Sequence, residues 1–365
     1  MNVCIVGDGL TSLSLAKNLV NKKINVHIYQ KKKINNPPST RTIGISANNL
    51  EFFKKEINKI PKKIIWEIKK IEIYSEKLKN NKILNFDDNK KNLFYMIKND
   101  ELYKCLMNEL SKSKLFKKIK ITKESFYNKL LGKNEYDLII NCDQNNPISK
   151  KYFTKKVDKD YRNLAYTTII EHEKLKNNSA IQVFTDSGPI AFLPIANMKT
   201  SVVCSIDVKN KTFSEKEISD LIYKHNPKFK IRKILELNSF MLKSSNLRNY
   251  YHNNILAFGD LLHRIHPLAG QGFNMTIRDI KVLSEIIQGK IELGLQLDSF
   301  ILEEFQKRTK DKNFIFSSGI DFIYEFFNFD KKIKAKSLNK ILQYFGKNKS
   351  FINSIITFAD KGLNI

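Results

Sequence analysis

Residues Ile255–Asp279, ILAFGDLLHRIHPLAGQGFNMTIRD, carry the strongest structural signal in the chain. The stretch begins with a short apolar strand, which a Gly-Asp pair at 259–260 ends. A proline and the turn Gly270-Gln271-Gly272 follow, and apolar residues then recur at near-helical spacing. Glycines let a backbone approach a ligand closely, and a helix N-terminus offers unpaired N–H groups and partial positive charge. This order of strand, carboxylate, glycine turn and helix predicts a site for an anionic cofactor.

The beginning of the chain shows a second arrangement of this kind. The apolar strand Asn2–Val6 runs directly into Gly7-Asp8-Gly9-Leu10-Thr11-Ser12, and a helix over 13–20 and a strand over 24–29 follow. This order is a dinucleotide-binding βαβ unit, in which Gly7 permits the tight turn and Gly9 lets the backbone approach a pyrophosphate. An NAD-binding Rossmann domain has the same unit, but a simple NAD dehydrogenase has no use for the motif at 255–279.

Two positions depart from the dinucleotide-binding fingerprint. The third glycine, which allows the helix to pack closely on the strand, is Ser12, and one added hydroxymethyl group is tolerable there. The acid expected at the end of the second strand, where it binds the adenosine ribose, is Gln30. An amide still forms hydrogen bonds to hydroxyl groups, but without charge-assisted strength. We therefore expect weaker binding of the cofactor, not its loss.

A lone glycine turn often only joins a strand to a helix, but the order G-D-x-x-H-x-x-H-P-x-x-G-Q-G-x-N-x-x-x-x-D over 259–279 is long. It resembles the second flavin motif of the FAD-dependent aromatic hydroxylases of the para-hydroxybenzoate hydroxylase type, and within them the ubiquinone-biosynthesis hydroxylases. The resemblance extends from Val3 to about Leu363 and is also close over 177–195. It implies an α/β fold in which a Rossmann-like FAD-binding domain with a parallel sheet is interleaved with an antiparallel-sheet substrate domain, followed by a C-terminal helical tail.

The resemblance and the spacing of strands together divide the chain. The FAD-binding domain is expected to be discontinuous, over 1–65, 91–160 and 250–330; the substrate domain is expected over 66–90 and 161–249, and the C-terminal helical region over 331–365. Short apolar runs between 165 and 207 predict the antiparallel sheet, and residues 216–233 look helical. Residues 329–358 mix lysine with apolar residues, so this segment either docks on the core or lies in a membrane interface.

The resemblance also implies which residues hold FAD. Arg41 would hold the phosphates or gate the flavin, although a solvated loop arginine is the alternative. The Asn99 amide would contact the cofactor, and Asp260 would bind its ribityl chain. Asp143 follows a strand at the place where the family has an Asp-Gly pair, and Gln144 is strained there if the turn needs a positive φ. The full expected set is Gly7, Gly9, Ser12, Gln30, Arg41, Asn99, Asp143, Gly259, Asp260, Gly270, Gln271, Gly272, Phe273 and Asn274.

Catalytic roles are expected at His263, His266 and Pro267. The histidines would act as general bases that deprotonate a phenol, and Pro267 would lie against the flavin edge. Alternatively, His266 supports the turn at Pro267 while His263 caps or packs. A helix that starts near Phe273 would direct its N–H groups at the negative end of the reduced flavin. No H-x-x-x-H helix or third ligand favours a metal site, so none is expected.

Composition sets further limits. A chain of 365 residues that is 42% hydrophobic suits one elaborate domain or two interleaved ones. No apolar run approaches the roughly 18–20 residues that span a bilayer, and the first apolar segment reads as a strand, so we expect a cytoplasmic protein, peripheral on the inner face of the cytoplasmic membrane. The formal net charge of +27 indicates attraction to anionic lipid or the codon bias of an AT-rich genome. Nucleic-acid motifs are absent, and the four scattered cysteines read as reduced core residues.

These features together predict a flavin-dependent monooxygenase. By resemblance, NAD(P)H reduces FAD, O2 forms a flavin C4a-hydroperoxide, and the aromatic ring of a polyprenylphenol or quinone precursor of ubiquinone takes the hydroxyl group. The expected partners are this lipid substrate, O2, a membrane surface and other quinone-synthesis enzymes, but no nucleic acid. Two alternatives remain: a related flavoprotein reductase that acts on prenyl lipids, and a degenerate FAD-binding accessory subunit, which the changes at Ser12, Gln30, Gln144 and Thr276 favour.

Overall fold

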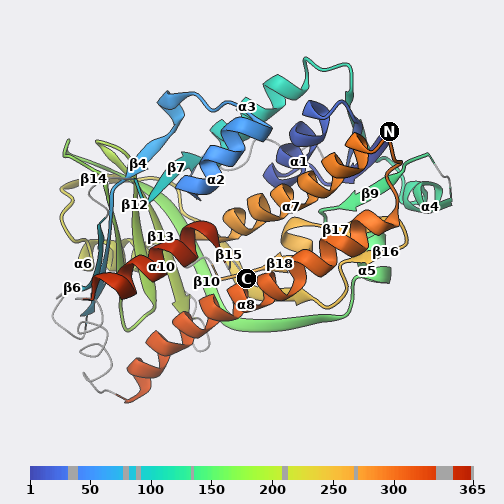
Figure 1. Ribbon diagram of the computed structural model, residues 1–365. Helices are drawn as coiled ribbons and strands as arrows, with labels where there is room; N and C mark the ends of the chain where they lie inside the picture. Colours follow the sequence, from blue (N-terminus) through green and yellow to red (C-terminus); the bar gives the residue numbers. More distant parts are fainter. Residues whose placement is uncertain are drawn as a thin grey trace.

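The computed structural model describes residues 1–31, 40–76, 82–87, 92–132, 135–207, 213–266, 270–333 and 348–362. These residues form a six-stranded, a nine-stranded and a three-stranded sheet. In Figure 1 the nine-stranded sheet occupies one side of the molecule, and most helices gather with the six-stranded sheet on the other. The predicted α/β fold, with a parallel sheet, an antiparallel sheet and C-terminal helices, is confirmed.

The six-stranded sheet is the predicted dinucleotide-binding core. Its order is β16-β17-β9-β1-β2-β8, and every neighbouring pair except β16–β17 is parallel. The central strands are buried on both faces, as apolar runs in parallel sheets usually are. Its strands are β1 (Asn2–Val6), β2 (Asn25–Gln30), β8 (Phe116–Lys120), β9 (Leu138–Asn141), β16 (Tyr251–His252) and β17 (Ile255–Ala257). The helices around it include α1 (Leu10–Asn21), α3 (Asn99–Leu110), α4 (Ser125–Gly132), α5 (Pro147–Tyr152) and α7 (Gly272–Glu292).

The nine-stranded sheet contains most of the expected substrate domain. Its order is β18-β15-β10-β13-β12-β11-β5-β6, with β14 paired to β10 off this path. All of its pairs are antiparallel except the parallel pair β11–β5. Its strands are β5 (Lys70–Ser75), β6 (Lys82–Asp87), β10 (Lys156–His172), β11 (Ser179–Phe184), β12 (Pro189–Ala196), β13 (Lys199–Asp207), β14 (Ile231–Ile234), β15 (Asn238–Leu247) and β18 (His263–Arg264). Strand β18 lies inside the 255–279 motif, so this motif reaches both large sheets.

The third sheet packs against the nine-stranded sheet through β12. It consists of β3 (Thr42–Ser46), β7 (Phe94–Lys98) and β4 (Trp66–Ile68), in that order. The indole of Trp66 donates a 2.6 Å hydrogen bond to the Asn177 carbonyl oxygen, which ties β4 to the segment before β11. The short helices nearby are α2 (Ala47–Phe52), the π-helix η1 (Phe53–Ile57) and the 3-10 helices η2 (Lys62–Ile64) and η4 (Gly259–Leu261).

The helix predicted over 216–233 is wrong in its second half. Helix α6 (Glu215–Lys224) begins at a capping box, in which Ser214 and Glu217 exchange hydrogen bonds, and it ends at Lys224. Pro227 follows shortly afterwards and disfavours a helix at the residue before it. Residues 231–234 then pair with β10 as β14, because the edge of the large sheet supplies backbone partners that the isolated sequence does not reveal.

Two helices end the described chain, α8 (Ser299–Ile333) and α10 (Lys349–Lys361). Ile352 of α10 packs in a cluster with Ile83, Leu84 and Phe86 of β6. At the other end of α10, Asp360 accepts a 2.9 Å hydrogen bond from the Asn48 backbone N–H of α2. Over 349–361 the tail therefore docks on the core, as one of the two expected alternatives stated. Within the described ranges, no helix is long and apolar enough to cross a membrane.

Candidate functional site

The carboxyl ends of four neighbouring parallel strands bring the expected cofactor residues to one edge of the six-stranded sheet. Three backbone hydrogen bonds join the loops there: Gly7 N–H to the Tyr29 carbonyl at 2.8 Å, Cys142 N–H to Val6 at 2.9 Å, and Phe258 N–H to Asn141 at 2.9 Å. In open α/β sheets, ligands bind in the crevice outside this edge. The loops after β1, β2, β9 and β17 are thus adjacent in space, although about 250 residues of chain separate the first from the last.

The first glycine turn is open on the side where a cofactor phosphate would lie. Gly7 has a φ of +108°, which an L-residue rarely adopts, and Gly9 is the N-cap of α1 without a side-chain cap. A Cβ built at Gly9 would meet nothing within 4 Å. Ser12, which occupies the third glycine position, is buried at 1% exposure. The first turn of α1 therefore presents backbone N–H groups to open space.

The second glycine motif packs directly on the first. Gly259 has a φ of +63°, and a Cβ built there would lie 2.6 Å from the Thr11 methyl carbon in the first turn of α1. Only glycine fits such an approach at such a φ. Asp260 follows at the exposed surface of this edge. The two motifs, 250 residues apart in sequence, thus form one contiguous structure.

The turn before α7 also leaves space at its glycines. Gly270 has a φ of +63° and approaches the backbone of Gly44 in β3, while a Cβ at Gly272 would meet nothing within 4 Å. Gln271 is the N-cap of α7, and its Oε1 atom is buried without a hydrogen-bond partner among the described residues. Phe273 packs against Phe53, with ring centroids 6.5 Å apart. The start of α7 therefore offers N–H groups and positive dipole to a ligand, as the sequence predicts.

The side chain of Asn274 serves the protein and is not available to a cofactor. Its amide group donates to the carbonyl of Gly44 at 2.9 Å, and its oxygen accepts from Ser46 N–H at 2.9 Å and from Asn49 at 3.0 Å. These bonds tie β3 and α2 to the first turn of α7. Any contact from Asn274 to a cofactor would have to come from its backbone.

A charged pair that the sequence did not indicate joins the loop after β1 to strand β8. The Lys118 ammonium group of β8 lies 3.0 Å from an Asp8 carboxylate oxygen and donates a 2.9 Å hydrogen bond to the Tyr103 hydroxyl. Burial by itself would lower the pKa of Lys118, but the bonds to Tyr103 and Asp8 outweigh burial and raise the pKa. Close by at the end of β2, the Gln30 Oε1 atom is buried without a hydrogen-bond partner, so this amide oxygen can accept from an incoming hydroxyl group.

Arg41 and Asn99 lie side by side, just before strand β3 and just after its antiparallel partner β7. The Asn99 N–H donates a 3.0 Å hydrogen bond to the Arg41 carbonyl, and Asn99 opens helix α3. The Arg41 guanidinium is exposed and lies 5.6 Å from the ring centroid of Phe240 on the nine-stranded sheet. Arg41 is therefore placed between the cofactor domain and the large sheet. The structure is compatible with the expected role and with a solvated loop arginine.

The turn after β9 accommodates Gln144 without a left-handed backbone. Asp143 accepts a 2.9 Å hydrogen bond from Asn145 N–H, and Gln144 is not among the residues with positive φ. The Gln144 amide instead donates to the carbonyl of Asp260, which ties the loop after β9 to the loop after β17. The strain that a positive φ would have caused at Gln144 is thus avoided.

His263 is held by a buried carboxylate. Its Nε2 atom lies 2.5 Å from a carboxylate oxygen of Asp279 on α7, and both side chains are 1% exposed. The other oxygen of Asp279 accepts a 3.0 Å hydrogen bond from Asn313 of α8. This environment favours the alternative in which His263 packs, because the ring nitrogen that reaches a partner reaches Asp279.

His266 is enclosed by aromatic side chains. Its ring stacks on Tyr324 of α8 at 4.3 Å and meets the edge of Tyr161 of β10 at 4.9 Å. Burial, assisted by the positive charge of Lys159, lowers the pKa of His266 to about 3, which makes it a poor general base. His266 therefore packs between α8 and β10; Pro267 and the turn expected there lie outside the described residues.

The residues at the strand-end edge fit FAD. Two glycine turns with open space over Gly9 and Gly272 give a pyrophosphate and a flavin access to backbone N–H groups. The unpartnered oxygens of Gln30 and Gln271 remain for hydrogen-bond donors of a ligand. Among the described residues, no cluster of three or more metal-binding side chains is present.

Comparisons with known proteins agree with this geometry. Residues 156–292 match the family model described as "FAD binding domain". The chain is 23% identical to the mitochondrial ubiquinone biosynthesis monooxygenase COQ6 of Dictyostelium discoideum over all of this chain and 92% of that protein. It is 30% identical to the 3-demethoxyubiquinol 3-hydroxylase of Escherichia coli over 44% of this chain and 42% of that protein.

The chain is also similar in fold to FAD-dependent monooxygenases of known structure. Among solved structures, p-nitrophenol 4-monooxygenase of Pseudomonas putida shares the fold with a TM-score of 0.78 at 14% identity, and covers all of this chain and 98% of its own. HpxO of Klebsiella pneumoniae, in complex with FAD and uric acid, has a TM-score of 0.76 at 11% identity, over 99% and 97% of the two chains. The chain is accordingly similar to FAD-dependent monooxygenases along its length, and its residues 156–292 match an FAD-binding domain.

Several residues that position the site were not predicted from the sequence. They are Asp8 and Lys118 beside the first turn, Asp279 as the partner of His263, and Tyr161 and Tyr324 around His266. The only sequence feature that pointed to Asp279 was its position as the last residue of the motif at 259–279. The tyrosines had none, because they come from β10 and from a C-terminal helix that no motif connects to the flavin loop.

Proposed function

We propose that the protein hydroxylates the aromatic ring of a polyprenylphenol or quinone precursor in ubiquinone biosynthesis. The names of the relatives in Dictyostelium discoideum and Escherichia coli support this substrate class. The observation that carries the flavin chemistry is the pair of glycine turns, packed together through Gly259 and Thr11 and open at Gly9 and Gly272. When bound, FAD supplies the redox chemistry, which is reduction by NAD(P)H and activation of O2.

The cofactor-binding roles follow from position at the strand-end edge. The first turn of α1, at Gly9, would hold the pyrophosphate, and the Gln30 amide would accept from a ribose hydroxyl. Asp143 and Asp260 end neighbouring loops and would bind hydroxyl groups along the cofactor. The N-terminus of α7 at Gly272 would stabilise negative charge on the ring system, because its N–H groups are oriented before reaction.

A substrate ring would approach from the side of the nine-stranded sheet. A cluster of buried apolar side chains connects that sheet with α7 and α8, and it contains Phe184, Ile265, Met275, Phe316 and Ile320. Phe192 of β12 lies in a separate core cluster under α6. We propose that His263 and His266 position the loop before Gly270, held by Asp279 and by the two tyrosines.

The test is spectroscopic and then chemical. Purified protein with added FAD should show a flavin spectrum that bleaches with NAD(P)H and recovers in air, with a hydroxylated prenylphenol as the product. Bleaching that leads to a saturated prenyl chain without O2 consumption would indicate the reductase alternative. Protein that takes up no FAD would indicate the accessory subunit, which Ser12, Gln30 and Thr276 keep open.

The cellular setting belongs to the same proposal. A prenylated substrate resides in a bilayer, so we infer a peripheral position on the inner face of the cytoplasmic membrane and contacts with other quinone-synthesis enzymes. The net charge of +27 supports attraction to anionic lipid. Fractionation of cells that express the full chain would test this, because a protein that stays in the supernatant at low ionic strength is not peripheral.

A further inference from the structure

Helix α8 has two faces of opposite character over residues 313–324. The inner face holds the site region together: Tyr324 stacks on His266, Asp321 accepts from the Tyr161 hydroxyl, and Ser317 accepts a 2.9 Å hydrogen bond from Asn246. The outer face carries large apolar side chains in solvent. Four of them form what we name the α8 patch, with exposures of 48%, 46%, 69% and 41% for Phe314, Ile315, Phe322 and Ile323.

The patch lies on one side of one helix. At about 100° per residue, Phe314, Ile315, Phe322 and Ile323 fall within an arc of roughly 180°, about 14 Å from first to last. In Figure 1, α8 is the long orange helix across the front, and its C-terminal end runs out past the nine-stranded sheet. Contiguous exposed apolar side chains on a monomer usually mark an interaction surface.

Charge around the α8 patch is positive. Lys307, Lys310 and Lys312 precede Phe314 within two turns, against the single carboxylate of Asp311. Glu325 beyond the patch is compensated by Lys159 of β10 at 3.0 Å. Aromatic and aliphatic side chains beside lysines are the combination that binds an anionic lipid surface, where the apolar groups enter the interface and the cations meet headgroups.

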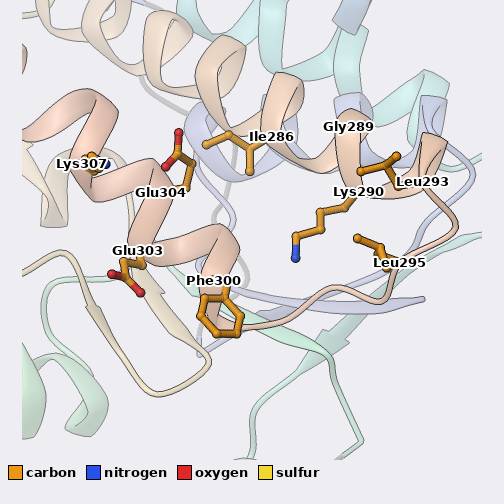
Figure 2. Close-up of a pocket in the computed structure, with 9 residues that line it drawn as sticks. All are labelled: Ile286, Gly289, Lys290, Leu293, Leu295, Phe300, Glu303, Glu304 and Lys307. Atoms are coloured by element: carbon orange, nitrogen blue, oxygen red, sulfur yellow. The ribbon is translucent and has the colours of Figure 1, made fainter.

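The shape of the patch favours a bilayer over a folded partner. The side chains of the α8 patch protrude into solvent, and none of them lines the two grooves beside α7. The larger groove, of about 480 Å³, lies between the C-terminal half of α7 and the beginning of α8, and Leu293 and Phe300 line it (Figure 2). A folded partner would need a complementary groove to bind these protruding side chains. A fluid bilayer adapts to them.

We propose that the α8 patch docks this protein on the surface of an anionic phospholipid bilayer. The inference rests on the proposed function, since that function requires a substrate from the lipid phase. The opposite face of the same helix contacts His266, three residues before the turn at Gly270. Docking through α8 thus brings the bilayer to the helix whose opposite face contacts His266.

The experiment is vesicle flotation of the full-length holoprotein. Vesicles contain phosphatidylglycerol and phosphatidylcholine in equal parts, or phosphatidylcholine alone. The test variant is Phe314→Ser with Phe322→Ser, and the matched control is Leu293→Ser with Phe300→Ser, whose side chains are 74% and 68% exposed in the groove of Figure 2. All four positions are exposed, so both variants should keep the wild-type circular dichroism spectrum.

We expect wild type and control to float with anionic vesicles, and the test variant to bind at least roughly tenfold more weakly. Binding should weaken with added salt and with neutral vesicles. The proposal is overturned if the wild type does not float, if the test variant floats as well as wild type, or if the control loses as much. A wild-type dimer that only the test variant dissociates, seen by light scattering, would identify a self-interface instead.

Vesicle flotation and FAD uptake test the docking surface and the proposed function separately. FAD uptake and bleaching by NAD(P)H do not involve the α8 patch, so both should be equal in the test variant and in wild type. Flotation that depends on Phe314 and Phe322 supports the docking surface even in a protein that takes up no FAD. Loss of FAD uptake in the test variant alone would show that the patch supports the fold, and would overturn the proposal.

Discussion

Replacing Gly259 by alanine tests whether the two glycine motifs form one structural unit. The backbone there has a φ of +63°, and the new Cβ would lie 2.6 Å from the Thr11 methyl carbon, closer than real Cβ contacts occur. A left-handed backbone costs an L-residue about 1–2 kcal/mol, and overpacking costs about 1–3 kcal/mol. The free energy of unfolding should therefore fall by about 2–5 kcal/mol, the sum of these two terms.

Two further variants separate the terms. Gly294 has a φ of +68° but open space around it, so Gly294→Ala should lose only the backbone part, about 1–2 kcal/mol. Thr11→Ser in the Gly259→Ala background removes the clashing methyl group and should return about 1–3 kcal/mol. Urea unfolding followed by circular dichroism measures each value. The reasoning is refuted if Gly259→Ala is as stable as Gly294→Ala, or if Thr11→Ser gives no rescue.

Five other variants test the site and its surroundings. Gly9→Ala and Gly272→Ala each add a methyl group to open space, so the free energy of unfolding should change by less than about 0.5 kcal/mol. The FAD dissociation constant, measured by flavin fluorescence, should rise roughly tenfold or more. An unchanged affinity would place the cofactor elsewhere. Asp279→Ala removes the partner of a buried histidine and should cost about 3–5 kcal/mol in urea unfolding; a loss below about 1 kcal/mol would contradict the pair. Burial lowers the pKa of His266 to about 3, from an ordinary value of 6.5. Its contribution to stability is therefore fully present above pH 6.5 and is lost as the pH falls towards 3, by at most about 5 kcal/mol; His266→Phe should flatten the pH dependence of unfolding, and an unchanged slope would refute this. Arg278 has both terminal nitrogens buried without a hydrogen-bond partner, so Arg278→Met should be neutral or stabilising by up to about 4 kcal/mol, and a destabilised protein would argue against this reading.

The parts of the site that could be predicted from the sequence are those set by local backbone requirements. Gly7, Gly259 and Gly270 do have positive φ, and the strand, turn and helix around each appear where the residue pattern indicates. Such signals are readable because glycine at a fixed spacing from an apolar run serves the same purpose in any protein. The expected strain at Gln144 was a local inference too, but the turn took another conformation, because the Gln144 side chain bonds to the loop at Asp260.

The residues that hold the site in place were not predictable in the same way. His263 looked like a base, and only the packing of α7 brought Asp279 against it. His266 is surrounded by Tyr161 and Tyr324, which are 105 residues before it and 58 residues after it, so no window of sequence contains the three together. A side chain's pKa and partners depend on which elements pack around it, and residue types alone do not specify those neighbours.

The sequence by itself determined the parallel sheet, the two glycine turns and the anionic cofactor, since these follow from residue type and short-range spacing. Tertiary structure alone decided that the turns meet at Gly259 and Thr11, and that Lys118 pairs with Asp8. It also decided that α8 contacts His266 on one face and exposes apolar side chains on the other. Backbone conformation is a local property of a few residues, whereas contact between distant side chains depends on sheet order and helix packing, which form only when the whole chain folds.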